Sequence, residues 1–326
     1  IVTARAGINM SGGQFLVGTG VTIGVAGVAT FRTGRIDVGD SLGNSSIGQG
    51  AGDAYTTGTN NTAVGKNALT AVTTGERNSA LGMNALGGSG TGVTNNTALG
   101  VNALYNTTGS SNTACGDAAL YTNTSGADNI GMGRNALFLN TTGGNNVAIG
   151  NYALDANTTA HDNTAMGVGA LGVMDGGTGK NCAFGNYSGD AITTGHTNNL
   201  FGYQAGTEIT TGYANCVFGN EALETNSTGY QNIAIGYKAL SLYTGNANVA
   251  MGNQALEDCS TGGQNVAVGH DAGRNITNGA YNTIVGYAAV DGSSSTSASY
   301  NVSVGSGSLG NASYAGNENT AVGHNA

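Results

Sequence analysis

The sequence contains no proline and no tryptophan, and only 8% of its 326 residues are charged, about a third of the share usual in soluble domains. Its nine Lys and Arg residues against eighteen Asp and Glu residues argue against nucleic acid as a partner, because binding to phosphates depends on Lys and Arg. No run of 18 or more apolar residues occurs, so we expect no membrane-spanning segment. The 59 glycines and 39% hydrophobic residues instead suit tight turns and a narrow core.

Cysteine gives no sign of a metal site or a disulfide framework. No two cysteines form a C-x-x-C pair, so we expect no zinc site. Cys182 and Cys216 occupy the same place in a repeat, two units apart, which at roughly 4.8 Å per stacked unit puts them beyond disulfide reach. We therefore expect free thiols at all four positions: Cys115, Cys182, Cys216 and Cys259.

The dominant feature is an internal repeat of 17 residues. The segment NTAVGKNAL at residues 61–69 recurs as NSALGMNAL, NTALGVNAL, NVAIGNYAL, NIAIGYKAL and NVAVGHDAG. Each copy has a glycine at its fifth residue, here called the anchor glycine, from which other positions are counted. The anchor glycines are 17 residues apart with deviations of one or two: Gly48, Gly65, Gly82, Gly100, Gly116, Gly133, Gly150, Gly167, Gly185, Gly202, Gly219, Gly236, Gly252, Gly269, Gly286, Gly305 and Gly323.

The repeat predicts an all-β fold, a β-solenoid of about 17 coils spanning residues 41–326. Helical repeats need about 33 residues or more, and no helical periodicity is visible, so we expect two short strands per coil instead. Extra residues fall between the Ala-Leu pair at positions +3 and +4 and the next repeat, in segments such as 87–95, 172–180 and 291–300, which we interpret as turns. Residues 1–40 lie outside the period, and we expect an N-terminal β segment or adaptor there.

Alternation within Asn-x-Ala-x-Gly predicts which side chains face inward. Positions −3 and −1 share one face, and their Thr, Val, Ile, Leu, Met and Phe residues are expected to form the core with the Leu at +4. Alanine at −2 and asparagine at −4 share the opposite face, where a flat alanine column would suit contact with another chain. We therefore expect a solenoid that is stable as an oligomer, and expect Val64→Asp or Phe218→Asp to disrupt assembly.

Asparagine occupies position −4 in every copy. Such a column is either a ladder that binds a ligand or a structural stack whose amides hydrogen-bond from coil to coil, and we favour the structural interpretation. The ladder asparagines include Asn61, Asn78, Asn96, Asn112, Asn129, Asn146 and Asn163.

We find no pattern that predicts catalysis, a cofactor or a metal. The four histidines are dispersed, and a polysaccharide-cleaving β-helix would need carboxylates gathered across adjacent coils. Calcium-binding nonapeptides and phosphate-binding loops are absent, and the threonines lie in turns instead of an ice-binding array. The nearest approach to a carboxylate cluster is Glu221, Glu224, Glu257 and Asp258, which we interpret as solvated surface.

Tyrosines are concentrated in the C-terminal half, at loop positions or directly after an anchor glycine. Exposed aromatic rings can stack on sugars or receptors, and they can also simply stiffen one face. The candidates for surface binding are Tyr203, Tyr213, Tyr230, Tyr237 and Tyr287.

The segments NVAIGNYAL, NTAVGKNAL and NVAVGHDAG resemble the repeats of trimeric autotransporter adhesin heads, and the longer unit NTAVG-xx-AL-xxx-TTG is similar to repeat regions of phage tail fibres. The resemblance covers residues about 44–326 and implies a left-handed parallel β-roll built by three chains. The 17-residue period is longer than that of the adhesin heads, which favours the phage group.

This resemblance implies a structural fibre protein of a phage virion, a homotrimer that contacts other virion or filament proteins and attaches to a glycan or protein of the host surface. The alternative is a bacterial trimeric surface adhesin or a secreted filament subunit, and a polysaccharide-degrading β-helix is less favoured. We expect a non-enzymatic protein without cofactors, located in the virion or at an extracellular surface. Because the chain begins with Ile1 instead of Met, we also expect it to be a processed or partial product.

Overall fold

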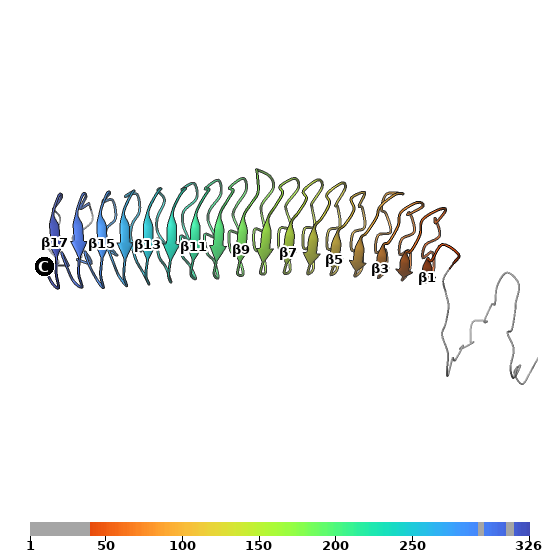
Figure 1. Cartoon of the computed structure of the whole chain (residues 1–326), viewed down its shortest axis with the longest axis horizontal. Coiled ribbons are helices and arrows are strands. Elements are labelled where there is room, and N and C mark those ends of the chain that lie inside the picture. Colours follow the sequence, from red (N-terminus) through yellow and green to blue (C-terminus); the bar gives the residue numbers. More distant parts are fainter. Residues whose placement is uncertain (1–39, 293–296, 311–315) are drawn as a thin grey trace, which may run out of the picture. The chain divides into compact units, whose positions relative to one another are not determined.

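The computed structural model describes residues 40–292, 297–310 and 316–326. These residues contain 17 parallel strands of three residues each, one per repeat, and no helix (Figure 1). The strands are β1 (Ser45–Ile47), β2 (Thr62–Val64), β3 (Ser79–Leu81), β4 (Thr97–Leu99), β5 (Thr113–Cys115), β6 (Ile130–Met132), β7 (Val147–Ile149), β8 (Thr164–Met166), β9 (Cys182–Phe184), β10 (Asn199–Phe201), β11 (Cys216–Phe218), β12 (Ile233–Ile235), β13 (Val249–Met251), β14 (Val266–Val268), β15 (Thr283–Val285), β16 (Val302–Val304) and β17 (Thr320–Val322).

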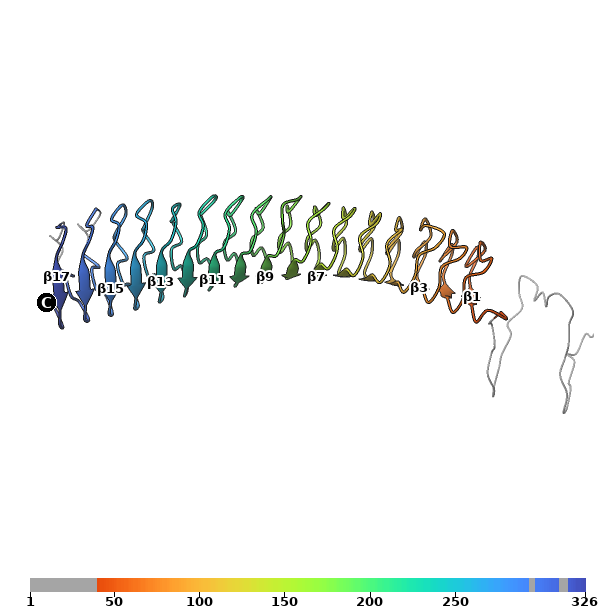
Figure 2. The same cartoon turned by 45° about the horizontal axis from the view of Figure 1, so that its top comes forward.

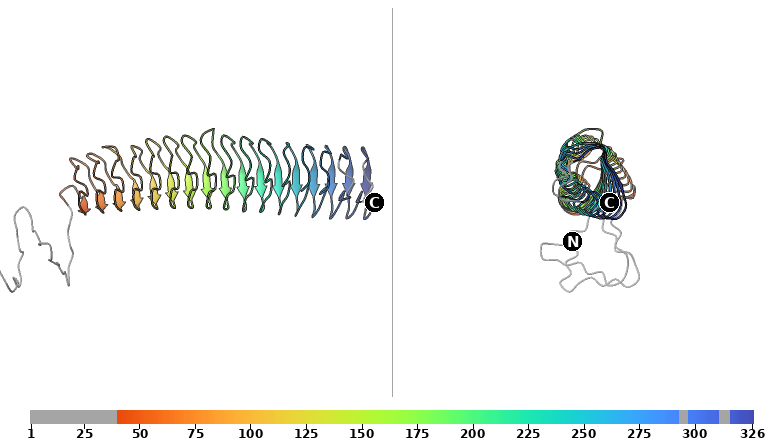
Figure 3. Two further views of the ribbon diagram at one scale, coloured as in Figure 1. Left: turned by 180° about the vertical axis from the view of Figure 1, so that it is seen from behind. Right: turned by 90° about the vertical axis from the view of Figure 1, so that its left-hand side faces the viewer.

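The strands pair in chain order into one sheet, so the predicted β-solenoid is confirmed. Viewed end on, the coils superpose around one narrow interior (Figure 3). Hydrogen bonds join neighbouring coils inside and outside the sheet: Val147 N donates to Asn163 O at 2.8 Å, and Leu154 N donates to Ala170 O at 3.1 Å. Each coil therefore satisfies its backbone through its neighbours, which suits stacking of many similar units.

The expectation of two strands per coil is wrong, because the second half of each coil turns too often to be extended. In one coil the backbone takes a positive φ at Asn145 (57°), Gly150 (136°), Tyr152 (60°) and Leu154 (50°). The left-handed conformation bends the chain at each of these residues. Only the three residues before the anchor glycine form a strand.

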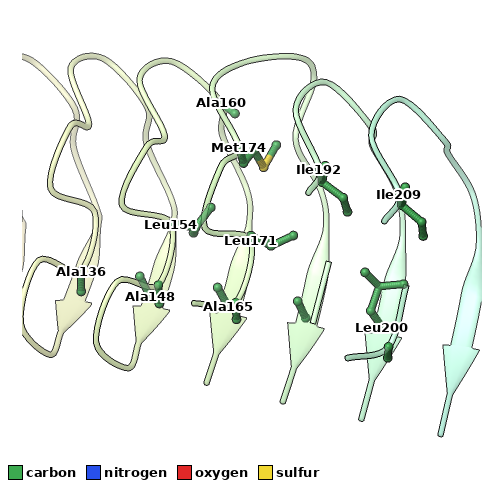
Figure 4. Close-up of a cluster of buried hydrophobic side chains, with 14 of the residues drawn as sticks. Ala136, Ala148, Leu154, Ala160, Ala165, Leu171, Met174, Ile192, Leu200 and Ile209 are labelled. Atoms are coloured by element: carbon green, nitrogen blue, oxygen red, sulfur yellow. The ribbon is translucent and has the colours of Figure 1, made fainter. Parts of the chain in front are cut away.

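The inward and outward faces of the strand are also the reverse of the expected ones. Ala148 at position −2 and Asn146 at −4 are fully buried, whereas Phe218 at −1 is 59% exposed and Val64 is partly exposed. The interior is too narrow for a bulky strand residue because Leu154 and its equivalents at +4 fill it from the opposite wall (Figure 4). A charge at Val64 or Phe218 would therefore not enter the core.

The core keeps its volume by exchange between two positions. In three of the four coils where glycine replaces leucine at +4, the −2 residue of the next coil is larger than alanine. The exception is Gly52, where the ring of Tyr55 lies against the glycine instead. A Cβ on Gly273 would lie 2.8 Å from Cδ1 of Ile284, in the next coil. A Cβ on Gly189 would likewise lie 2.7 Å from Cδ1 of Leu200, in the next coil. In these coils, close packing requires one large side chain, either at +4 of one coil or at −2 of the next, and leaves no room for both.

The anchor glycine is needed for two reasons. Gly150 has φ 136°, a conformation that side chains rarely adopt, and a Cβ there would lie 2.4 Å from the carbonyl oxygen of Gly167. The stacked glycine column therefore lets successive coils approach closely.

A second column of buried asparagines, at position +7, was not anticipated. Asn140 Nδ2 donates to Asn123 Oδ1 at 2.6 Å, and Asn157 Nδ2 donates to Asn140 Oδ1 at 2.8 Å. Met174 takes the equivalent place in the next coil (Figure 4), so Asn157 Oδ1 is buried without a hydrogen-bond partner.

Insertions do not disturb the sheet. Between β15 and β16, where the repeat is longest, Thr283 still pairs with Val302 and Val285 with Val304. The expected N-terminal β segment, residues 1–40, lies outside the described residues except for Asp40.

Candidate functional site

The asparagine ladder lies inside the solenoid, where its amides are occupied by the chain itself. Asn146 Nδ2 donates to Ala160 O at 2.9 Å, and Asn146 Oδ1 accepts from Asn163 N at 3.0 Å and Asn163 Nδ2 at 3.1 Å. The same contacts recur along the column; for example, Asn78 N donates to Asn61 Oδ1 at 2.9 Å. Burial of this kind leaves no amide free for a ligand, so the arrangement is that of a structural ladder. The seven asparagines predicted for it are all fully buried: Asn61, Asn78, Asn96, Asn112, Asn129, Asn146 and Asn163.

The outer face of the sheet, here called the sheet face, is formed by positions −3 and −1 of the 17 strands, which follow one another along the solenoid (Figure 2). Position −1 is apolar in every strand, whereas position −3 carries Ser, Thr or Asn in nine of them. No charged residue occurs in any of these strands. Phe184, Phe201 and Phe218 stack along the face with ring centroids 4.9 and 5.7 Å apart. Its exposed large side chains are Ile47, Leu81, Leu99, Ile130, Met132, Met166, Phe218, Ile233, Met251, Val266, Val285, Val302 and Val322.

The cysteines agree with the expectation of free thiols. Cys182 and Cys216 both pair in register with Asn199, which separates them by one strand. Burial raises the pKa of the Cys259 thiol to about 12, because an apolar interior disfavours the thiolate.

Two of the five tyrosine candidates lie together. Tyr213 and Tyr230 occupy position −6 of successive coils, and their rings stack with centroids 4.9 Å apart. The ring of His196 extends the stack at 5.1 Å from Tyr213. At its other end the stack borders a shallow depression of about 320 Å³ that also involves Gln231, Asn246, Thr261 and Gln264.

The other three candidates, at position +1, do not come together. Tyr203, Tyr237 and Tyr287 belong to coils that are not adjacent, although all three rings are exposed. Tyr287 stacks on His270 at 5.5 Å instead. Lys238 Nζ lies 5.5 Å from the centre of the Tyr237 ring.

The carboxylates singled out from the sequence are engaged in part with cations. Glu221 lies 3.4 Å from Lys238, and Glu257 lies 3.0 Å from Arg274. Burial, followed by the charge of Glu221, raises the pKa of Glu224. Within the described ranges, no three metal-ligating side chains of His, Cys, Asp or Glu converge.

A pattern at position +5 escaped the sequence analysis. Over nine successive coils this position alternates between an acidic residue and another type: Asp155, Gly172, Asp190, Thr207, Glu224, Ser241, Glu257, Arg274 and Asp291. Burial raises the pKa of four of the acids: Asp155, Asp190, Glu224 and Asp291. The alternation could have been read from the aligned repeats, but its partial burial depends on the fold. We call this set the +5 column.

Comparison with known proteins adds no relative. A scan against models of protein families and a search of curated proteins both found no match. Among the residues with a described structure, no helix could cross a bilayer.

Proposed function

We propose that this chain forms the shaft of a homotrimeric fibre, a non-enzymatic phage tail fibre or appendage that takes part in attachment to a host surface. The observation that carries the proposal is the uncharged sheet face, whose column at position −1 is apolar in every strand and exposes many large side chains. The same observation supports the alternative of a bacterial surface adhesin or secreted filament subunit. In both cases the protein would act in a virion or at an extracellular surface, bound to other filament proteins.

The size of the sheet face supports burial between chains. Seventeen strands at about 4.8 Å spacing, each three residues of about 3.3 Å, give a face of roughly 800 Å². A stable interface buries about 800 Å² per partner, and the apolar column at position −1 runs along the whole of this face. An exposed face of this size would favour association over solvation.

The absence of charge on the sheet face points the same way. Charged side chains on a packed face would lose their hydration at a cost in free energy, and this chain places its charges outside the strands. Packing of two further copies on the face would bury the phenylalanine stack and the flanking methionines. This arrangement replaces the interface expected on the alanine face, because the alanines lie in the core.

Light scattering coupled to size-exclusion chromatography tests the assembly, with electron microscopy to show its shape. We expect the mass of three chains and a rod. Leu81→Asp places a charge on the sheet face and should lower the mass towards one chain. Leu139→Asp is the matched control, since Leu139 is similarly exposed but lies outside the strands.

A wild-type monomer at micromolar concentration would refute the assembly. So would equal dissociation by both variants, because the effect would then not belong to the sheet face. Far-ultraviolet circular dichroism of each variant separates lost assembly from lost folding.

The attachment role rests on the stack of the exposed Tyr213 on the half-buried Tyr230 and on its adjoining depression, since aromatic faces pack well against sugar rings. We expect the Tyr213→Ser/Tyr230→Ser double variant to lose binding in glycan-array and whole-cell assays while keeping its oligomeric mass. Tyr105→Ser, which alters a separate ring stack, should bind normally. Undiminished binding by the double variant would refute this site.

A further inference from the structure

Coil 8 of the solenoid, residues 167–184, carries a notch on its outer surface. Two glycines, Gly169 at position +2 and Gly172 at +5, leave out the side chains that both neighbouring coils have. The gap has a volume of about 270 Å³, near the lower end of ligand pockets. Its remaining lining consists of Val168 and Val173 from the same coil and Tyr152, Asp155, Tyr187 and Asp190 from the two neighbours.

Two carboxylates converge over Gly172. The point where a Cβ on Gly172 would stand lies 2.7 Å from Asp190 Oδ1 and 3.7 Å from Asp155 Oδ1. Burial raises the pKa of both acids, and the charge of Asp190 raises that of Asp155 further. Within the described residues no Lys, Arg or His forms an ion pair with either carboxylate. The two negative charges are therefore close together, partly desolvated and uncompensated.

The other walls of the notch are apolar and aromatic. Val168 and Val173 are both exposed, and the ring of Tyr187 lies against Gly169, with Cδ1 3.0 Å from the position of an added Cβ. On the opposite side, the guanidinium of Arg134 already lies over the Tyr152 ring, 4.8 Å from its centre. A tyrosine at this rim thus contacts a cation within the chain itself.

The same column shows what the chain places between two acids elsewhere. Arg274 occupies in its coil the position that Gly172 occupies in coil 8, and it lies between Glu257 and Asp291 of the neighbouring coils. Its Nε is 3.0 Å from Glu257, and its charge opposes the rise in the pKa of Asp291. Between Glu257 and Asp291, the guanidinium of Arg274, carried on an aliphatic stem, compensates the negative charge of the two acids. The gap over Gly172 has the acids but lacks the cation.

We propose that the notch over Gly172 is a binding site for an external guanidinium group carried on a short apolar stem. The planar cation would bridge the carboxylates of Asp155 and Asp190, as guanidinium groups do with paired oxygens. Its stem would pack on Val168 and Val173 beneath the Tyr187 ring. None of these residues belongs to a strand, so the site does not depend on the proposed oligomer.

Isothermal titration of the full chain with n-propylguanidinium chloride tests the site. We expect saturable binding of one cation per chain, and at least tenfold weaker binding of the neutral analogue n-butanol. The Asp155→Asn/Asp190→Asn double variant should lose binding at least tenfold. Asp128→Asn is the matched control, because it removes one negative charge far from the notch and should bind as the wild type does.

A second variant fills the site from within. Gly172 does not require a positive φ, so Gly172→Arg can place its guanidinium between the two acids as Arg274 does. We expect this variant to fold, to be at least as heat-stable as the wild type and to bind no n-propylguanidinium.

Several results would overturn the proposal. These are no saturable binding to the wild type, unchanged binding by the Asp155→Asn/Asp190→Asn or Gly172→Arg variant, and equal binding of n-butanol. Binding of calcium chloride but not of n-propylguanidinium would show that the notch is a metal site instead. n-Propylammonium chloride, titrated in parallel, should bind more weakly if the paired oxygens recognise the planar cation.

Discussion

Replacement of Asn146 by alanine removes one member of the internal ladder and leaves the rest of the sequence unchanged. The side chain of Asn146 is fully buried and takes part in three hydrogen bonds, two accepted from Asn163 and one donated to Ala160. Alanine cannot replace any of them. We therefore expect Asn146→Ala to be strongly destabilising although it introduces neither charge nor bulk.

The magnitude follows from which groups keep another partner. Ala160 O still accepts from Asn157 Nδ2 at 3.2 Å, and Asn163 Nδ2 still donates to His161 O at 3.1 Å. The backbone N–H of Asn163, by contrast, keeps no hydrogen-bond acceptor in the ladder. One buried donor left unsatisfied costs about 1–3 kcal/mol and each lost hydrogen bond about 1 kcal/mol. The unsatisfied donor and the two other lost hydrogen bonds should together lower the unfolding free energy by about 3–5 kcal/mol.

Urea denaturation followed by circular dichroism measures this loss, with Asn253→Ala as the matched control. Asn253 is exposed, and a surface substitution of this kind changes stability by about 0.5 kcal/mol or less. Because coils interact mainly with their neighbours, amide hydrogen exchange should accelerate at Asn163 but not at Asn78. If the two variants unfold at the same urea concentration, the ladder does not stabilise the solenoid as argued.

Three further predictions concern the core and its titratable groups. Ile284→Ala should lower the unfolding free energy by about 2–5 kcal/mol, and Gly273→Leu should lower it by about 1–3 kcal/mol through overpacking. In a double-mutant cycle, the variant with both changes should lose less than the sum of these two values. Simple additivity would contradict the exchange of volume between these positions. Cys259 should resist iodoacetamide at pH 8 until urea unfolds the chain, because burial raises its thiol pKa to about 12; mass spectrometry of native labelled protein would reveal any reaction. Burial raises the pKa of Asp190 in the folded chain. The contribution of Asp190 to stability is therefore fully present below its pKa in the unfolded chain, about 3.9, and is lost as the pH rises through its folded pKa. Asp190→Asn should thus have a higher urea midpoint than the wild type at pH 7 but not at pH 3, and equal midpoints of the two proteins at both pH values would count against this assignment.

The sequence alone was sufficient for the architecture. The repeat places a glycine every 17 residues, an asparagine four residues before it and an apolar residue directly before it. This pattern fits neither a helix nor an ordinary globular core. It requires equivalent positions to stack, and the structure pairs Val147 with Thr164 and Ile149 with Met166 accordingly. Insertions could be assigned to turns for the same reason, since paired strands cannot absorb them.

Which side of the strand faces inward was decided only by the tertiary structure. Alternation gives two faces and cannot distinguish them when one carries Ala148 and Asn146 and the other Val147 and Ile149. Size suggested the bulkier pair as core, but the left-handed turns at Tyr152 and Leu154 bring the opposite wall so close that only alanine fits beside the leucine. The same geometry places the paired acids of the +5 column around Gly172, because their approach depends on how closely neighbouring coils stack.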